Sequence, residues 1–218
     1  MPLVPSVTEL VIAQLLYLNY QSDSLITLYL NSPGEIVPIF ILLVALFNSL
    51  PHFPPYIPHH SPTPALQKIK GTNSPDGKAF SFDTEAFAIA DTMQFIRPPI
   101  RTICVGQAFG TAAMLLSLGQ KGNRFALPNA SIMLNQPKSR ARGQASDVAI
   151  KAKEIINNRK VTNEFLAKAC GKDLSVIEKD TQRVRYLSPE EAIEYGLIDK
   201  VLYPEELRTQ APRFLEFL

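Results

Sequence analysis

The sequence predicts an α/β fold whose sheet is mainly parallel. Short apolar runs of strand length alternate along the chain with longer segments of helical periodicity. The run at 100–106 is apolar on both faces, which is typical of a strand that helices cover on each side of the sheet. Capping signals delimit several helical segments, most completely in SPEEAIEYG at 188–196.

The first part of the chain contains two predicted helices and a strand. A helix over about 6–18 starts with a capping-box pattern at Ser6 and has one apolar face. The run LITLYL at 25–30 predicts a strand, which the breaker NSPG ends. A capped helix is predicted over 83–96, where an arginine and two prolines stop it.

The second part continues the alternation of strands and helices. The elements that we expect are a strand, a helix, a strand and a long helix, at 100–106, 108–118, 130–137 and 146–169. The long helix ends at Gly171, because glycine is favoured just past a helix. A capped helix over 188–196 and a last strand at 200–203 complete the pattern.

The composition predicts one globular domain. Of the 218 residues, 46% are hydrophobic and 19% are charged, which suffices for one sizeable core. The net charge of +2 gives no electrostatic case for binding nucleic acid or an anionic membrane surface. Cys104 and Cys170 lie in apolar contexts, so we expect buried free thiols rather than a disulfide.

The segment at 35–70 differs in composition from the rest of the chain. It begins with an apolar run at 36–47, which is shorter than the ~20 residues that a membrane-spanning helix needs. Prolines are then frequent between 51 and 64 and are incompatible with a continuing helix or a central strand. We interpret the segment as retained intron sequence, with a genuine insertion as the alternative.

Several sequence blocks follow one another in the order LYLNSPG, DTMQFI, TICVGQA, GQKGNRFALPNASIML, GQASDVAIKAKEI and YLSPEEAIEYGLIDKV. In this order they resemble the ClpP family, the proteolytic subunits of the ATP-dependent Clp protease. The resemblance implies one ClpP-like domain over 1–34 and 71–204, an insertion at 35–70 and a tail at 205–218. It also implies a crotonase-like fold of repeated β/α units, with a protruding handle helix, assembled in two stacked rings of seven subunits.

The resemblance implies that the catalytic triad is absent. Active members carry a serine, a histidine and an aspartate, and the matching positions here hold Gly110, Asn135 and Val184. Glycine has no hydroxyl, an asparagine amide takes no proton at neutral pH, and valine cannot orient a base. Loss of an essential triad residue lowers turnover on the order of 10⁶-fold. The chain is therefore similar to ClpR, the non-catalytic relatives found in plastids and cyanobacteria.

The matching oxyanion region is also altered. Active members have a second glycine whose N–H group holds the oxyanion, whereas Glu35 follows Gly34 here. All the histidines of the chain, His52, His59 and His60, lie in the unusual segment and leave the matched domain without an imidazole. For that segment we favour a solvated proline-rich loop over a metal site or a relocated base.

Three other side chains could be considered as nucleophiles. We expect Ser117 to be a core or interface hydroxyl, because it lies two turns along the helix from Gly110. Ser131 lies in a predicted strand, and the sequence around it contains no residue that could act as a general base. Cys104 precedes the turn at Gly110, and we expect a buried apolar residue there, since nothing nearby in the sequence would lower its pKa.

The long helix is expected to carry an assembly function. The resemblance implies a ring–ring interface on this handle, for which the candidate residues are Gln144, Val148, Ile150, Ile155 and Ile156. The alternative is an amphipathic helix that packs only on its own core. The stretch PKSRARGQA at 137–145 resembles the handle strand of the family, or else forms a solvated hairpin.

From these observations we predict a structural, catalytically inactive subunit of a Clp protease core. The expected partners are active ClpP and other ClpR subunits in a tetradecameric core, together with an Hsp100/Clp ATPase, in the chloroplast stroma. No cofactor, metal, nucleic acid or membrane is expected, and the N-terminus lacks the hairpin, early strands and transit peptide of such proteins. The alternatives are an active serine peptidase with relocated catalytic residues and a crotonase-type acyl-CoA enzyme.

Overall fold

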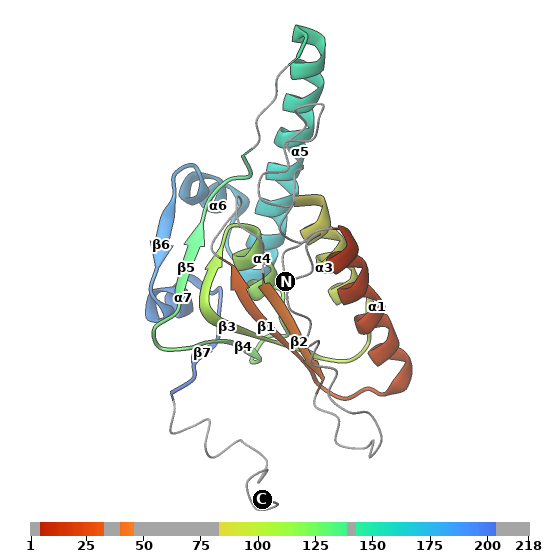
Figure 1. Cartoon of the computed structure of the whole chain (residues 1–218). Coiled ribbons are helices and arrows are strands. Elements are labelled where there is room, and N and C mark those ends of the chain that lie inside the picture. Colours follow the sequence, from red (N-terminus) through yellow and green to blue (C-terminus); the bar gives the residue numbers. More distant parts are fainter. Residues whose placement is uncertain (1–4, 33–39, 46–82, 139–142, 204–218) are drawn as a thin grey trace, which may run out of the picture.

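Helices surround a branched sheet in the computed structural model, which describes residues 5–32, 40–45, 83–138 and 143–203 (Figure 1). The helices are α1 (Pro5–Gln21), α3 (Asp83–Phe95), α4 (Thr111–Ser117), α5 (Ala145–Cys170), α6 (Leu174–Thr181) and α7 (Pro189–Tyr195). The strands are β1 (Ile26–Ser32), β2 (Phe40–Ala45), β3 (Ile100–Phe109), β4 (Arg124–Ala126), β5 (Ser131–Leu134), β6 (Arg185–Leu187) and β7 (Lys200–Val201).

Strand β3 is the centre of the sheet. The main path runs β2-β1-β3-β4-β7, while β5 pairs with both β3 and β6. The pairs β1–β3, β3–β4, β3–β5 and β4–β7 are parallel, and only β1–β2 and β5–β6 are antiparallel among the described strands. The predicted α/β class with a mainly parallel sheet is therefore confirmed.

Strand β3 changes partner along its length. Its residues 102–104 pair with β4, whereas its last residues, 107–109, pair with β5. Between these stretches Gly106 has a φ of +85°, and a Cβ atom there would lie 3.6 Å from the side chain of Asn31. A positive φ favours glycine because it has no Cβ. The end of β3 thereby turns away from β4 toward β5.

Helix α4 forms the middle of the core. All of its side chains are buried, and it packs against β3, α3 and α5. On the same side of the sheet, α1 packs on α3 (Figure 1). The largest fully buried side chains come from α1, β1, α3, α4, β5, α5 and α6 and include Leu15, Leu28, Ile89, Leu115, Leu134, Leu166 and Ile177. One hydrophobic cluster thus connects the sheet to the root of the long helix.

Most predicted elements are confirmed, with corrections at their ends. Helix α1 begins at Pro5, so Ser6 lies in the first turn and not at the cap. Helix α4 begins at Thr111 and not near residue 108, because Gly110 has a positive φ that interrupts helical geometry. The caps at Gly171, with φ 68°, and around Ser188 are confirmed. Sequence reasoning missed β4, α6 and β6, which are all short.

Strand β2 lies within the segment at 35–70, where we expected no regular element. It pairs antiparallel with β1, so that Ala45 lies opposite Ile26 and Phe40 opposite Asn31. The unbroken apolar sequence FILLVA suits a strand that covers the edge of a buried sheet. The proline-dense part of the segment lies outside the described residues, and the origin of the segment stays a prediction.

Candidate functional site

A tight turn joins strand β3 to helix α4 and holds Gly110. Its backbone has φ 59° and ψ −118°, a conformation that glycine adopts more readily than other residues. The N–H of Gly110 donates to the carbonyl of Met133 at 2.9 Å, and the carbonyl of Gly110 accepts from Ala113 N–H at 3.0 Å. A strand, a sharp turn and a helix also make the nucleophile elbow of many hydrolases. Here the same geometry carries no side chain.

The strand register places the three triad-matching positions at one end of neighbouring strands. Phe109 of β3 pairs with Met133 of β5, and Leu134 of β5 pairs with Arg185 of β6. One step beyond these pairs, Gly110 follows β3, Asn135 follows β5 and Val184 precedes β6. The carboxyl ends of the parallel strands β3 and β5 meet at the same edge of the sheet. Strand β6 runs antiparallel to β5 and begins at that edge, so the three positions form one local site.

The side chains at these positions provide neither a nucleophile nor a base. Asn135 is buried, with 8% of its surface exposed, and Val184 is 44% exposed. An amide can accept or donate hydrogen bonds but takes no proton near neutral pH, and an isopropyl group can do neither. The arrangement therefore cannot perform the proton transfers that activate a serine in acyl transfer.

The other candidate nucleophiles have environments that disfavour reaction. Ser117 is buried at the end of α4, and its hydroxyl donates to the carbonyl of Met114 at 2.7 Å. Cys104 is fully buried in β3, and this burial raises the pKa of its thiol to about 12. A thiol with so high a pKa is almost wholly protonated at neutral pH and is a poor nucleophile. Ser131 lies in β5 opposite Gln107 of β3.

A polar network beside Val184 holds the start of strand β6. Asp180 accepts a hydrogen bond from the Tyr195 hydroxyl at 2.9 Å and forms an ion pair with Arg185 at 3.2 Å. The Nζ of Lys172 lies 3.7 Å from the centroid of the Tyr195 ring. Burial and the hydrogen bond to Asp180 raise the pKa of Tyr195, so its hydroxyl keeps its proton. Sequence reasoning missed this network, because its members come from separate elements with no motif between them.

Helix α5 has two different halves. Its C-terminal half packs on the core through Asn158, Thr162, Asn163 and Leu166, which are buried. Its N-terminal half extends beyond the rest of the described chain (Figure 1). Gln144 occupies the N-cap position of this half.

The protruding half of α5 presents apolar side chains. Val148, Ile150 and Ile156 are 38%, 69% and 65% exposed, while Ile155 is half-buried. Exposed apolar side chains on this half fit a ring–ring contact, and the alternative, an amphipathic helix that packs only on its own core, stays open. The role of these residues in a ring–ring interface stays a prediction.

Some of the predicted sites lie outside the described residues. These are the altered oxyanion positions Gly34 and Glu35 and the histidines at 52, 59 and 60. Within the described ranges, no cluster of three or more His, Cys, Asp or Glu side chains could hold a metal ion. Of the helices described, none is long and apolar enough to cross a membrane.

Comparison with known proteins identifies the family. The Clp protease family matches residues 72–205. An ATP-dependent Clp protease proteolytic subunit-like protein of Synechococcus elongatus is 43% identical over 197 residues, which are 90% of this chain and 70% of that protein. A similar protein of Synechocystis is 43% identical over 203 residues, covering 92% of this chain and 74% of the relative.

A plant relative is named a protein related to the proteolytic subunits, and not a proteolytic subunit itself. The chloroplastic ATP-dependent Clp protease proteolytic subunit-related protein 4 of Arabidopsis thaliana is 42% identical over 206 residues, 94% of this chain. This chain spans only 55% of the length of that relative. The family match, these identities and the α/β fold with its long helix agree with the resemblance seen in the sequence. The chain belongs to the Clp protease family of proteolytic subunits and has the fold of that family.

Proposed function

We propose that this protein is a catalytically inactive, ClpR-type subunit of a Clp protease core. The observation that carries the proposal is the set of residues at the elbow site, Gly110, Asn135 and Val184. These residues supply no hydroxyl, no imidazole and no carboxylate at the three positions where the family resemblance assigns them. The serine-peptidase route needs a nucleophile within hydrogen-bond reach of a base, and a third group that orients this base.

The exposed half of α5 supports a role in assembly. A monomer gains nothing from placing Ile150 and Ile156 in water, whereas a subunit that packs against another one buries them. The outward face of α1 adds further uncovered apolar surface, with Tyr17 52% exposed and Tyr20 90% exposed. We therefore assign the chain a place in a mixed ring of active ClpP and other ClpR subunits, which works with an Hsp100/Clp ATPase.

The proposed location is the chloroplast stroma. It follows from the plant relative, which is named as chloroplastic, and from the similarity to cyanobacterial proteins. In such a core the subunit would shape the degradation chamber and lower the number of active sites in its ring.

Two other functions would contradict this proposal. A serine peptidase with relocated residues needs an activated hydroxyl, and the buried Ser117 is already bonded to a carbonyl of its own helix. A crotonase-type acyl-CoA enzyme would need an acid or base at the elbow, where Asn135 and Val184 lie. A fluorophosphonate probe should leave this chain unlabelled, and acyl-CoA compounds should leave its melting temperature unchanged.

The decisive experiment is affinity purification of the tagged native protein, followed by mass spectrometry. We expect Clp proteolytic subunits in stoichiometric amounts and no fluorophosphonate label on this chain within the complex. Active subunits in the same sample provide the positive control for the probe. A monomer without Clp subunits would remove the assembly role, and a labelled chain would remove the claim of inactivity.

A further inference from the structure

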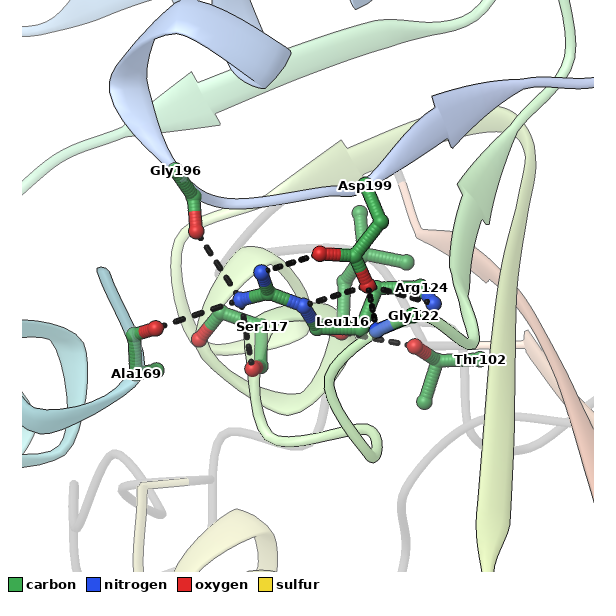
Figure 2. A network of polar contacts seen from close by, with 8 residues as sticks. All are labelled: Thr102, Leu116, Ser117, Gly122, Arg124, Ala169, Gly196 and Asp199. Atoms are coloured by element: carbon green, nitrogen blue, oxygen red, sulfur yellow. Dashed lines mark hydrogen bonds and ion pairs between the residues drawn. The ribbon is translucent and has the colours of Figure 1, made fainter. Parts of the chain in front are cut away.

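Arg124 lies at the meeting point of three helix ends. Figure 2 shows its guanidinium between the carboxylate of Asp199 and three backbone carbonyls. Nη1 donates to the carbonyls of Gly196 at 2.9 Å, Ala169 at 3.2 Å and Ser117 at 3.4 Å. The Arg124 side chain is only 6% exposed. The buried guanidinium donates hydrogen bonds to these carbonyls in place of the water molecules that would otherwise do so.

The three carbonyls belong to the C-terminal ends of three different helices. Ser117 is the last residue of α4, Ala169 lies in the last turn of α5, and Gly196 is the C-cap of α7. The last carbonyls of a helix have no intrahelical partner and carry the negative end of its dipole. One guanidinium therefore contacts helix-end carbonyls of α4, α5 and α7 together. Because Nη1 has two hydrogens, one of them is shared between two of the three carbonyls.

Asp199 fixes the guanidinium from the opposite side. Its Oδ1 accepts from Nη2 of Arg124 at 2.6 Å, and its Oδ2 accepts from Nε at 3.0 Å. Oδ2 also accepts from the backbone N–H groups of Gly122 at 2.7 Å and Arg124 at 3.0 Å. The resulting two-pronged pair leaves Arg124 little freedom to rotate. Arg124 is the first residue of β4, Asp199 directly precedes β7, and these two strands pair in parallel.

We propose that the Arg124–Asp199 pair is a clasp that sets the direction of the handle helix. The clasp ties the C-terminal end of α5 to α4, α7 and the sheet. The N-terminal end of α5 protrudes. Position 152 lies about 27 Å along α5 from its last residue, Cys170, so a tilt of about 10° at that end moves position 152 by about 5 Å. Handle residues reach a partner subunit only if this direction is fixed, and that consequence alone rests on the proposed function.

The direction of the handle can be measured in the isolated full-length chain by electron spin resonance. Spin labels at Ala152→Cys on the handle and Asp91→Cys on α3 report the distance between two exposed positions. Cys104 is buried, and Cys170, which is only half-buried, is changed by Cys170→Ala in every labelled chain so that it takes no label. We expect one narrow distance distribution for the chain with Arg124 and Asp199 intact.

Two substitutions should release the clasp. Arg124→Lys keeps the charge but cannot reach the carboxylate and three carbonyls at once, and Asp199→Asn keeps the shape but removes the charge. Each should shift or broaden the distance distribution, by about 5 Å for a tilt of about 10°. Lys160→Met is the control, because it breaks an exposed ion pair with Glu164 on the same helix. An unchanged distribution in folded Arg124→Lys and Asp199→Asn would overturn the proposal.

Hydrogen exchange on the unsubstituted chain provides a test that does not depend on the folding of a variant. As denaturant is raised, the amides of Gly122 and of the last turn of α5 should become exposed together, because the clasp joins them in one unit. Separate opening of these two groups would also overturn the clasp. Both measurements use the isolated chain and do not depend on partners. If the handle direction is fixed but no Clp subunits co-purify, the proposed function is refuted and the clasp stands.

Discussion

The elbow, which is the turn at Gly110, and the handle, which is the protruding half of α5, differ in what could give each a function. At the elbow it is the shape of the backbone, and on the handle it is the exposed side chains. At the elbow, the turn at Gly110 has the shape of a nucleophile-bearing turn. The neighbouring Asn135 and Val184 carry no group that takes a proton near neutral pH. On the handle, an ordinary helix presents Ile150 and Ile156, which are 69% and 65% exposed within the described chain. The elbow is a buried part of the core, because all of α4 is buried, whereas the first half of α5 lies outside it.

This difference teaches where each proposed role resides. Chemistry depends on three side chains at the strand ends and can be lost while the backbone remains in place. Assembly depends on an exposed surface and can be lost while the fold remains stable. Substitutions at the two regions should therefore separate folding from association.

The largest effect is expected on the handle. Ile150→Asp together with Ile156→Asp should abolish co-purification of Clp subunits, because charged groups would have to be desolvated in the contact. The melting temperature of the chain should stay nearly unchanged, since both side chains are more than half exposed. Lys153→Ala, an exposed change on the same half, is the control. Normal complex recovery with the double variant would remove α5 from the interface.

The elbow helix should respond in the opposite way. Leu115 is fully buried in α4, so Leu115→Ala should lower the free energy of unfolding by about 3 kcal/mol through lost burial and a cavity. Ile156→Ala on the handle should lower it by less than about 0.5 kcal/mol. Urea unfolding of the two variants measures both values. Equal losses would mean that the handle is packed within the isolated chain.

The Arg124–Asp199 pair connects the two regions and should make stability depend on pH. Burial acts to raise the pKa of Asp199, but hydrogen bonds from the Arg124 side chain and backbone and from Gly122 outweigh it and lower the pKa. Since the folded pKa is lowered, this stabilisation is fully present above the ordinary pKa of about 3.9 and is lost as the pH falls toward the folded value.

The test compares urea midpoints of the unsubstituted chain and Asp199→Asn between pH 7 and pH 3. The difference in stability should be constant at neutral pH and should shrink only in the acid range. A difference that does not change with pH would mean that the Asp199 carboxylate has the same pKa in the folded and unfolded chain.

A smaller effect is expected from a side chain at the turn itself. Gly110→Ser should lower the free energy of unfolding by about 1–2 kcal/mol, because φ is 59° there. The variant should remain unlabelled by a fluorophosphonate and should cleave no peptide, since Asn135 and Val184 supply no base and no orienting carboxylate. Measurable cleavage by this variant alone would contradict the mechanism of inactivity.

Periodicity and capping residues predicted the long elements well. The handle was expected over 146–169 and spans Ala145–Cys170, because its apolar pattern is long and Gly171 ends it in a left-handed conformation. The resemblance also placed Gly110, Asn135 and Val184 at positions that the register now brings to one end of three strands. That these positions lack catalytic function stays a prediction.

The parts that sequence reasoning missed depend on tertiary contacts. Strands β4 and β6 each have three residues, which is too short for any periodic signal. Arg124 would be expected in solvent from its residue type, and only the fold reveals the three helix ends around it. Likewise, Asp180 and Tyr195 are brought together by the packing of α6 and α7, since no local pattern connects them.

The smallest effect should come from an ion pair on the protruding half of the handle. Lys151 and Glu154 lie 2.7 Å apart, but their side chains are 30% and 45% exposed. Such pairs contribute less than about 1 kcal/mol, because water and salt screen the charges. Lys151→Met should therefore change the urea midpoint of the isolated chain very little, at low or high salt. A large, salt-dependent loss of stability would show that contacts within the chain hold this half of α5. The handle would then be part of the folded core, as the elbow is.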